Sequence, residues 1–411
     1  MRIIEVIWSL RPEDGGPREV VLALSGKLAE AGHDVSICYL RSWPPEPGFI
    51  PPPDVTLHAC RSWPDFARTL RTLARDADVI HSHGIWEPSH LCAAWICRLT
   101  RTPFVTTVHG MLHPWELRQR RLKKWFATVL LQRRILNRAQ CVVALTNSER
   151  AQVAAYAPGA VIEVVPNGVG SSFLQGPARP FAPPQILYYG RIAEKKGLQH
   201  LIGGFAQIAT HYPRVRLRLI GPATAPMAAK LRAWIAASPF AHRIVWDPAV
   251  WGAERARALV DAANILVLPS MAEGMSLAVL EAMAAGLPVV ISEPCGFPEA
   301  QSHGCGLVIR PTAASVAAAL KQLLTDPKSA AAMGARGRAY VAAAFNWKAI
   351  ADRTLDIYRL AAREATVPDN HQDVQLPPPH QKSAVRTSNV PLAPVTELAV
   401  MTRNGLEPPN R

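Results

Sequence analysis

Residues 269–290 read PSMAEGMSLAVLEAMAAGLPVV, and the sequence around this stretch decides the fold class. An apolar run, Ile265–Leu268, ends immediately before it, and a second apolar run, Pro288–Ile291, closes it. Between the two runs, a Pro-Ser turn leads into a short segment rich in Ala, Leu and Met. A strand, a short helix and a second strand are therefore predicted in this order, which is the unit that builds parallel sheets.

The same alternation extends outward along the chain. A helical pattern over Pro17–Ala31 follows the first apolar run. The other predicted strands are Arg2–Trp8, Asp34–Leu40, Val79–Ser82, Phe104–Val108, Cys141–Leu145, Ile186–Tyr189, Arg216–Ile220 and Ile244–Trp246. The sequence thus predicts an α/β fold with two mostly parallel sheets, one in each half of the chain.

A Pro-rich stretch, Ser171–Gln185, separates the two series of strands and has the composition of a linker. The end of the chain carries eight prolines in 48 residues and no sustained helical or strand period, which predicts disorder. The predicted parts are an amino-terminal domain, a linker, a second domain, a final helix and a disordered tail, over residues 1–172, 173–184, 185–345, 346–363 and 364–411.

The composition excludes some classes of protein. The 411 residues are 49% apolar, which excludes wholesale disorder, and single cores rarely grow past ~250–300 residues, which favours two domains. Seven scattered cysteines without a CxxC pair favour a reduced, cytoplasmic compartment. The apolar start, Met1–Leu10, is expected to be a strand rather than a signal peptide, and no uncharged apolar stretch reaches the ~18 residues of a membrane span.

The net charge of +14 is compatible with nucleic acid, an anionic membrane or a phosphorylated substrate. Half of this excess lies in Trp115–Arg138, which has no Pro or Gly and carries apolar residues at helical spacing. A helix lying on an anionic membrane is predicted, and an ordinary domain helix is the alternative. No nucleic-acid motif accompanies the segment, so no nucleic-acid partner is expected. The membrane-surface candidates are Arg120, Arg121, Lys123, Lys124 and Trp125.

The sequence YGRIAEKKG, residues 189–197, directly follows a predicted strand. Arg191 and Lys196 place two cations at the carboxyl end of that strand, where they are suited to bind phosphate oxygens. A solvated turn with ordinary surface cations is the alternative.

Two acids, Glu273 and Glu281, stand eight positions apart in the stretch 269–290. A helix that began at Glu273 would place both on one side, facing one ligand. Free amides at Gly274, Met275, Ser276 and Leu277 would form a helix N-terminus that favours a phosphate. Glu281 lies in an apolar run and needs a partner, for which sugar hydroxyls are suited, although a satisfied helix-face glutamate is the alternative.

The order GR-x4-KG followed by E-x7-E resembles the GT-B-fold retaining glycosyltransferases of family 4. Gly15-Gly16, Val165–Val169 and Phe345–Trp347 also stand in the family's order, so the resemblance covers residues 1–363. It implies two Rossmann-like domains that face a central cleft, a nucleotide-sugar donor and transfer with retention of configuration.

The resemblance also implies a role for each matching position. Arg191, Lys196 and residues 274–277 would bind the donor diphosphate, and Glu281 would bind the ribose. The catalytic candidates are His109 and Glu273, which would lie near the transferred sugar, and Gly15 and Gly16 would belong to the loop near donor and acceptor. Taken alone, His109 and the two glycines also fit purely structural roles. The family's aromatic and glycine are replaced by Met275 and Ser276, and Gly170 stands where an Asp is frequent.

No metal site and no cofactor are expected. Asp76-Ala77-Asp78 has the DxD form but directly precedes a predicted strand, and no acid or thiolate is spaced to complete a zinc site with His81 and His83. The predicted function is metal-independent transfer to a hydroxyl acceptor at the inner face of the cytoplasmic membrane. The acceptor is expected to be a saccharide, in particular a lipid-linked one for exopolysaccharide or O-antigen. The alternatives are a sugar-nucleotide 2-epimerase of the same fold and a sugar-nucleotide-binding protein without turnover.

Overall fold

The computed structural model describes residues 1–11, 15–40, 49–118, 125–175, 184–247, 257, 260 and 262–366, without the side chains of 125–130 and 364–366. The predicted disordered tail therefore lies almost wholly outside the described residues.

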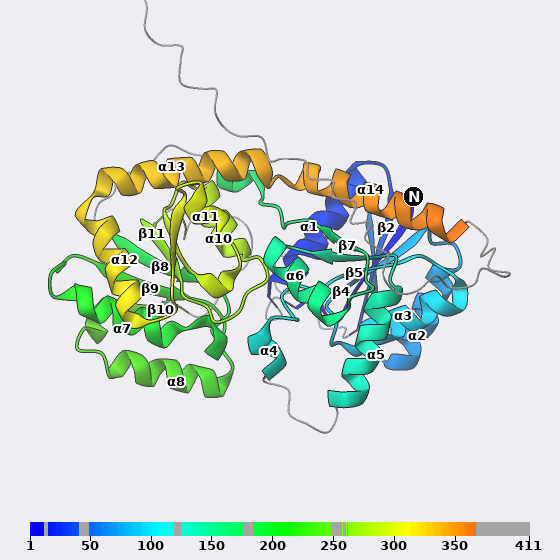
Figure 1. Cartoon of the computed structure of the whole chain (residues 1–411), viewed down its shortest axis with the longest axis horizontal. Helices are drawn as coiled ribbons and strands as arrows, with labels where there is room; N and C mark the ends of the chain where they lie inside the picture. The colour runs from blue at the N-terminus through cyan, green and yellow to red at the C-terminus, as the bar shows by residue number, and fades with distance from the viewer. Residues whose placement is uncertain are drawn as a thin grey trace, which may run out of the picture. The chain divides into compact units, whose positions relative to one another are not determined.

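The first half of the chain forms a seven-stranded parallel sheet with the order β3-β2-β1-β4-β5-β6-β7 (Figure 1). Its strands are β1 (Arg2–Ile7), β2 (Asp34–Leu40), β3 (Val55–Cys60), β4 (Val79–His83), β5 (Phe104–Thr107), β6 (Cys141–Ala144) and β7 (Ile162–Val164). Every residue of the inner strands β4, β5 and β6 is buried, as expected for a parallel sheet with helices on both faces.

The helices of this first domain are α1 (Gly16–Glu30), α2 (Trp63–Ala74), α3 (Pro88–Thr100), α4 (Pro114–Arg118), α5 (Trp125–Arg138) and α6 (Asn147–Tyr156). Hydroxyl side chains cap the N-termini of two of these helices, α2 and α6. The Ser62 hydroxyl accepts a hydrogen bond from the Asp65 amide at the start of α2, and Thr146 caps α6 in the same way. The predicted helix Trp115–Arg138 is present as α4 and α5, and residues 119–124 between them lie outside the described residues.

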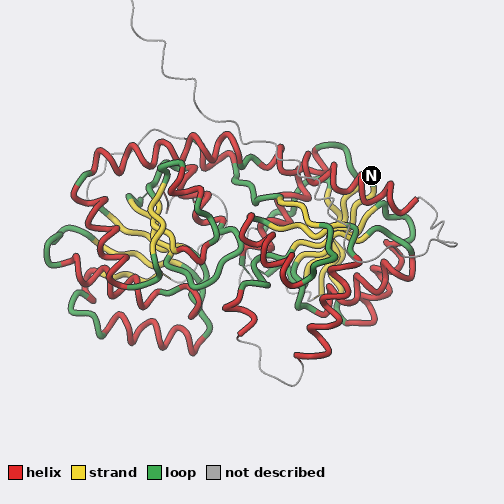
Figure 2. The backbone as a smooth tube through the Cα atoms, in the orientation of Figure 1, coloured by secondary structure: helices red, strands yellow, loops and turns green. Residues whose placement is uncertain are grey.

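The second half forms a six-stranded parallel sheet with the order β10-β9-β8-β11-β12-β13. Figure 2 shows the strands of each half in yellow, with helices in red around them. Its strands are β8 (Gln185–Tyr189), β9 (Arg216–Ile220), β10 (Ile244–Asp247), β11 (Ile265–Leu268), β12 (Val289–Ser292) and β13 (Gly306–Ile309). Its helices are α7 (Leu198–Ala209), α8 (Ala225–Ala236), α10 (Leu277–Ala284), α11 (Glu299–Ser302), α12 (Ala313–Thr325) and α13 (Pro327–Ala344). The predicted class of two parallel-sheet, Rossmann-like domains is confirmed.

Three strands, β3, β7 and β13, were not predicted from the sequence. All three lie at the edge of a sheet, and most of their residues are only half-buried. An edge strand needs no continuous apolar run, so its pattern resembles that of a loop.

The last helix, α14 (Trp347–Thr366), packs on the first domain. It lies against α1, where Leu355 and Tyr358 share a buried cluster with Leu24 and Leu28. Trp347, the first residue of α14, packs against Gly168. A Cβ at position 168 would lie 2.5 Å from the Trp347 ring, so only glycine fits there. Residues 346–363, predicted as a separate final helix, thus complete the core of the amino-terminal domain. Within the described residues, no helix is both long enough and apolar enough to cross a membrane.

Candidate functional site

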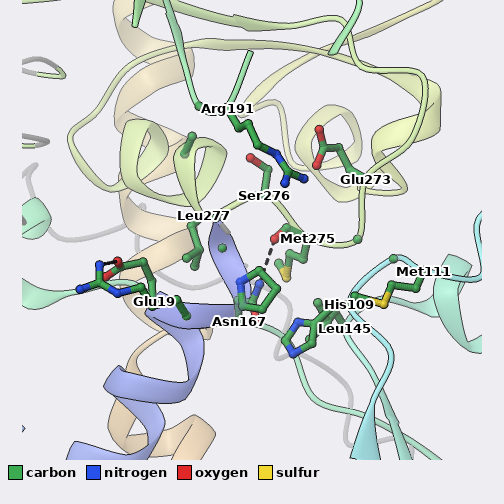
Figure 3. Close-up of a pocket in the computed structure, with 18 of the residues that line it drawn as sticks. Glu19, His109, Met111, Leu145, Asn167, Arg191, Glu273, Met275, Ser276 and Leu277 are labelled. Atoms are coloured by element: carbon green, nitrogen blue, oxygen red, sulfur yellow. Dashed lines mark hydrogen bonds and ion pairs between the residues drawn. The ribbon is translucent and has the colours of Figure 1, made fainter. Parts of the chain in front are cut away.

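A pocket with a cavity volume of about 520 Å³ is lined by segments that follow strands of both sheets. Ligands of parallel α/β sheets bind at these carboxyl ends of the strands. Figure 3 shows Arg191, Ser276 and Glu273 on one side, with Asn167, Leu145 and His109 on the other. The structure brings every predicted catalytic and donor-site residue and both loop glycines to this pocket: His109, Glu273, Arg191, Lys196, Gly274, Met275, Ser276, Leu277, Glu281, Gly15 and Gly16.

Lys196 and Glu273 form an ion pair in the pocket. The Lys196 Nζ lies 2.5 Å from the Glu273 Oε1, and the two side chains are 13% and 10% exposed. Burial by itself would raise the pKa of Glu273, but the charge and hydrogen bond of Lys196 outweigh burial and hold this pKa below its ordinary value. Glu273 is therefore ionised. The ion pair uses one N–H group of Lys196 and leaves the others for a ligand in the pocket.

The turn that carries Lys196 requires a glycine after it. Gly197 has a φ of 64°, and a Cβ there would lie 2.1 Å from the carbonyl oxygen of Pro269. The chain thus passes close to the segment that precedes Glu273, which accounts for the Lys196–Glu273 contact. Arg191, two residues after β8, is exposed toward the pocket, and its carbonyl accepts a hydrogen bond from the Tyr188 hydroxyl at 2.8 Å.

Glu273 precedes the short helix that contains Glu281, so the condition that would place both acids on one side of a single helix is not met. Helix α10 begins at Leu277, with Ser276 as its N-cap, and Glu273 belongs to the preceding loop. Both acids nevertheless line the pocket, because the loop after β11 brings Glu273 to it while Glu281 extends from the second turn of α10. The amides of the segment 274–277 lie at the N-terminus of this helix, where an anion is favoured.

Glu281 is half-buried, and its carboxyl group lacks a complete set of hydrogen bonds. Its Oε2 is buried and has no hydrogen-bond partner among the described residues. Burial, with a smaller contribution from the charge of Glu19, raises the pKa of Glu281 to about 8. A buried oxygen without a donor is costly, so this position is suited to a ligand that donates hydroxyl hydrogens.

His109 lies after β5 on the opposite side of the pocket. Its φ of 53° is in the left-handed region, which is uncommon for a side chain of this size. The next residue, Gly110, donates its amide hydrogen to Glu149, whose other oxygen accepts from the Leu145 amide at 2.5 Å. Burial raises the pKa of Glu149 to about 6, although the two amides oppose this shift. Glu149 therefore fixes the backbone that presents His109.

Two contacts join the loops on the two sides of the pocket. The Asn167 Nδ2 donates to the Met275 carbonyl at 2.8 Å (Figure 3), and Lys195 Nζ lies 2.5 Å from Glu116 Oε1. Asn167 belongs to the family-like motif Val165–Val169, but the sequence does not predict it as a site residue. Asn167 and Met275 are 108 positions apart in the sequence, so residue spacing does not reveal that they are in contact.

Gly110 and Gly274 bring the two backbones together. A Cβ at Gly110 would lie 2.5 Å from the Gly274 amide nitrogen, and a Cβ at Gly274 would lie 2.9 Å from the Gly110 nitrogen. Both positions therefore require glycine for the observed approach of the loops.

Gly15 and Gly16 line the pocket after β1. Gly15 has a φ of 87°, and Gly16 opens α1. Residues 12–14, immediately before them, lie outside the described residues.

One expectation about metal ligands needs correction. Although no acid is spaced along the sequence to join His81 and His83, β1 pairs with β4 and places Glu5 beside them. Glu5, His81 and His83 are buried, with candidate ligand atoms within 4.8 Å of one another. Asp76 and Asp78 instead contact Arg2 between α2 and β4, with Asp78 accepting from the Arg2 amide at 2.7 Å.

The membrane-surface candidates Arg120, Arg121, Lys123 and Lys124 lie outside the described residues, and Trp125 begins α5 without a described side chain. In the rest of α5, Gln132 and Leu136 are buried, while Leu131 and three arginines (133, 134 and 138) are exposed.

Two family models match the chain, a glycosyl transferase 4-like domain over residues 15–168 and glycosyl transferases group 1 over residues 175–340. Alpha-maltose-1-phosphate synthase of Mycolicibacterium smegmatis is 28% identical over 321 residues, which are 70% of this chain and 80% of that protein. Sucrose-phosphate synthase of Thermosynechococcus elongatus superposes with a TM-score of 0.74 at 23% identity, over 87% of this chain and 98% of that chain.

HepE of Anabaena, solved in complex with UDP and glucose, superposes with a TM-score of 0.72 at 17% identity, over 87% of this chain and 98% of that chain. These likenesses confirm the predicted fold class.

Proposed function

Because the chain belongs to the group 1 glycosyl transferases, with a glycosyl transferase 4-like domain before the group 1 domain, we propose that it transfers a sugar from a nucleoside-diphosphate donor to a hydroxyl acceptor with retention of configuration. The observation that carries the proposal is one pocket that combines Arg191, Lys196 and the N-terminus of α10 with the partnerless oxygen of Glu281. Cations and amides match a diphosphate, and an unsatisfied carboxyl oxygen matches ribose hydroxyls.

In the proposed reaction, the acceptor oxygen bonds to the anomeric carbon of the sugar. The bond from this carbon to the diphosphate oxygen breaks, and its electron pair leaves with the diphosphate. The acceptor proton passes to an oxygen of the leaving phosphate on the same face. Arg191, Lys196 and the amides of residues 274–277 stabilise the negative charge that develops on the diphosphate.

Glu273 orients the donor sugar or stabilises its developing positive charge rather than attacking the anomeric carbon. The Lys196 ammonium bonded to its Oε1 supports this role, because a carboxylate held by a cation is a weaker nucleophile. These side chains supply the positive charge that a diphosphate needs, so we propose that the reaction requires no metal ion and no cofactor.

The proposed acceptor is a saccharide, in particular a lipid-linked one used for polysaccharide synthesis. Trp8 and Trp86 line the pocket from the amino-terminal domain, and the Trp86 indole N–H donates to the Met111 carbonyl at 3.0 Å. Fixed aromatic side chains beside polar groups suit an amphipathic sugar ring.

Exposed side chains on α3 and α5 support a peripheral position on the cytoplasmic face of an anionic membrane. The two helices are joined by a hydrogen bond of 2.8 Å between Gln132 and His90, and they lie in the same part of the domain (Figure 1). Trp95 and Leu99, one turn apart on α3, are 64% and 60% exposed. Arg98, between them on the same helix, is exposed too, and exposed apolar side chains beside a cation match an anionic lipid surface in both chemistry and charge.

Thermal denaturation of the full chain with a panel of nucleotide sugars tests the donor assignment. One donor is expected to raise the Tm more than its free nucleoside monophosphate, because a specific ligand stabilises the folded state. The selected donor is then incubated with and without saccharide acceptors, in the presence of EDTA. Turnover that needs the acceptor and survives EDTA supports transfer; conversion of the sugar without an acceptor indicates epimerisation, and no response to any donor overturns the proposal.

A further inference from the structure

A network of hydrogen bonds connects His109 in the pocket, through His83, which also lines it, to Glu5, which does not. His109 Nε2 lies 3.0 Å from His83 Nδ1, and His83 Nε2 lies 2.7 Å from Glu5 Oε2. Glu5 and His83 are fully buried or nearly so. Which atom donates and which accepts in each of these hydrogen bonds can be worked out from Glu5 toward His109.

Glu5 can only accept hydrogen bonds while it is ionised. Burial would raise the pKa of Glu5, but the charge of His81 and the hydrogen bonds of His81 and His83 outweigh burial and keep this pKa below its ordinary value. His83 must therefore carry its proton on Nε2. Burial lowers the pKa of His83 to about 4, although Glu5 opposes this shift, so His83 is neutral and its Nδ1 is an acceptor.

An acceptor at His83 Nδ1 requires a donor at His109 Nε2. Burial, together with His83 and His81, lowers the pKa of His109, so this ring is neutral too and its Nδ1 carries no proton. The other oxygen of Glu5 accepts from the Tyr358 hydroxyl of α14 at 2.8 Å, and that hydroxyl accepts from His81 Nδ1 at 2.6 Å. His81 Nε2 completes the network with Thr107 at 2.7 Å.

We propose that Glu5 acts through His83 as a positioning residue that fixes His109 as the neutral tautomer protonated on Nε2, so that His109 offers an acceptor at Nδ1 to a hydroxyl group of the substrate. The role at the substrate rests on the proposed function, whereas the tautomer does not. A bound metal ion is the competing use of Glu5, His81 and His83. The hydrogen bonds favour the network, because both nitrogens of His81 and both nitrogens of His83 already have a partner.

The tautomer is measured by ¹⁵N NMR of the histidine imidazoles in the full chain without ligand, with metal content determined on the same sample. We expect His83 and His109 to be protonated on Nε2 only, with no stoichiometric metal. A proton on His109 Nδ1, a cationic His109 at pH 7 or one metal ion per chain would overturn the assignment.

The positioning role is tested by Glu5→Gln. Its amide offers one acceptor and one donor, so it cannot accept from both His83 and Tyr358, and one arm of the network must reverse or lose a bond. We expect kcat to fall about 10- to 100-fold, as when carboxylates that orient ligand histidines are removed, while nucleotide affinity is unchanged. Glu5→Asp, which keeps two acceptors, is expected to recover part of kcat.

His90→Gln is the matched control, because His90 is equally buried in the same domain. Its hydrogen-bond partners among the described residues are Ser82, Thr106 and Gln132, none of which lines the pocket. It should lower Tm without a comparable loss of kcat. Native kcat in folded Glu5→Gln would overturn the positioning role. If the native chain binds no nucleotide while the predicted tautomer is observed, the proposed function fails and the tautomer assignment stands.

Discussion

The Lys196 Nζ lies 2.5 Å from the Glu273 Oε1 in the pocket between the two sheets. The pair joins the turn after β8 to the loop after β11, the two motifs that carried the family resemblance. The pair itself has no net charge. A diphosphate bound here would share Lys196 with Glu273, and the negative charge that develops as the bond to the sugar breaks would lie on the phosphate oxygens beside Lys196.

Removal of the Lys196 charge should therefore affect the transition state most. Lys196→Ala is expected to reduce kcat roughly 100- to 1,000-fold, as for the loss of one charge-stabilising donor, while the protein stays folded. Steady-state kinetics and circular dichroism measure the two effects. Lys230→Ala is the control, since Lys230 is an exposed cation 3.4 Å from Glu194. Unchanged turnover in folded Lys196→Ala would remove the diphosphate assignment.

The raised pKa of Glu281 predicts a pH-dependent stability. The folded state holds a proton on Glu281 up to about pH 8, whereas the ordinary value is 4.5, so the folded state binds more protons between these values. The free energy of unfolding contributed by this group is therefore largest below pH 4.5 and falls as pH rises to 8.

Glu281→Gln cannot ionise and should lose this dependence. Without nucleotide, its Tm relative to the native chain is expected to be higher at pH 8.5 than at pH 5, by about 2–4 °C for each kcal/mol in a domain of this size. Thermal denaturation at both pH values measures it, and Glu194→Gln, at an exposed acid, should show no such trend. An equal Tm difference at both pH values would contradict the burial of an ionisable Glu281.

Because Gly110 and Gly274 approach closely, adding a single methyl group at position 274 is expected to lower kcat/KM strongly. Gly274→Ala places a Cβ about 2.9 Å from the Gly110 nitrogen and must push the two loops apart. We expect kcat/KM to fall about 100-fold, since a displacement near 1 Å can cost that much. Gly170→Ala is the control, because a Cβ there meets only ordinary contacts of 3.6 Å or more. Native kcat/KM in Gly274→Ala would show that catalysis does not need this approach.

The membrane proposal predicts salt-dependent binding to anionic vesicles. Neutralising Arg120, Arg121, Lys123 and Lys124 together should weaken binding to phosphatidylglycerol liposomes by more than about 100-fold, given roughly 1 kcal/mol per cation near the surface. Sedimentation at several salt concentrations measures the effect, which should be steepest at low salt.

Neutralising four exposed cations of the second domain, Arg214, Arg216, Lys321 and Lys328, should change liposome binding little. Trp95→Ala should weaken the binding that remains at high salt, because apolar contacts are not screened. If the variant with positions 120, 121, 123 and 124 neutralised bound liposomes as well as the native chain does, the segment Trp115–Arg138 would be an ordinary domain helix without a membrane role.

The sequence alone determined the two parallel sheets and most of the pocket. Inner strands such as Ile265–Leu268 are buried on both faces, so they form continuous apolar runs that need no tertiary information to be recognised. Arg191 and Lys196 come in the turn after β8, and Glu273 comes in the loop after β11, at the carboxyl ends where ligands bind. Glu281 lies in the helix that follows this loop. Local order along the chain was therefore sufficient for Arg191, Lys196, Glu273 and Glu281.

The tertiary structure decided which distant residues meet. Glu5 and Tyr358 are 353 positions apart yet share a hydrogen bond, and Asn167 reaches Met275 across the pocket. The Glu5 contacts depend on the pairing of β1 with β4 and on the packing of α14 against α1. Neither can be predicted from the spacing of residues along the sequence. The physical reason is that strand order and helix packing are set by the burial of the whole core, whereas a motif records only its neighbours along the chain.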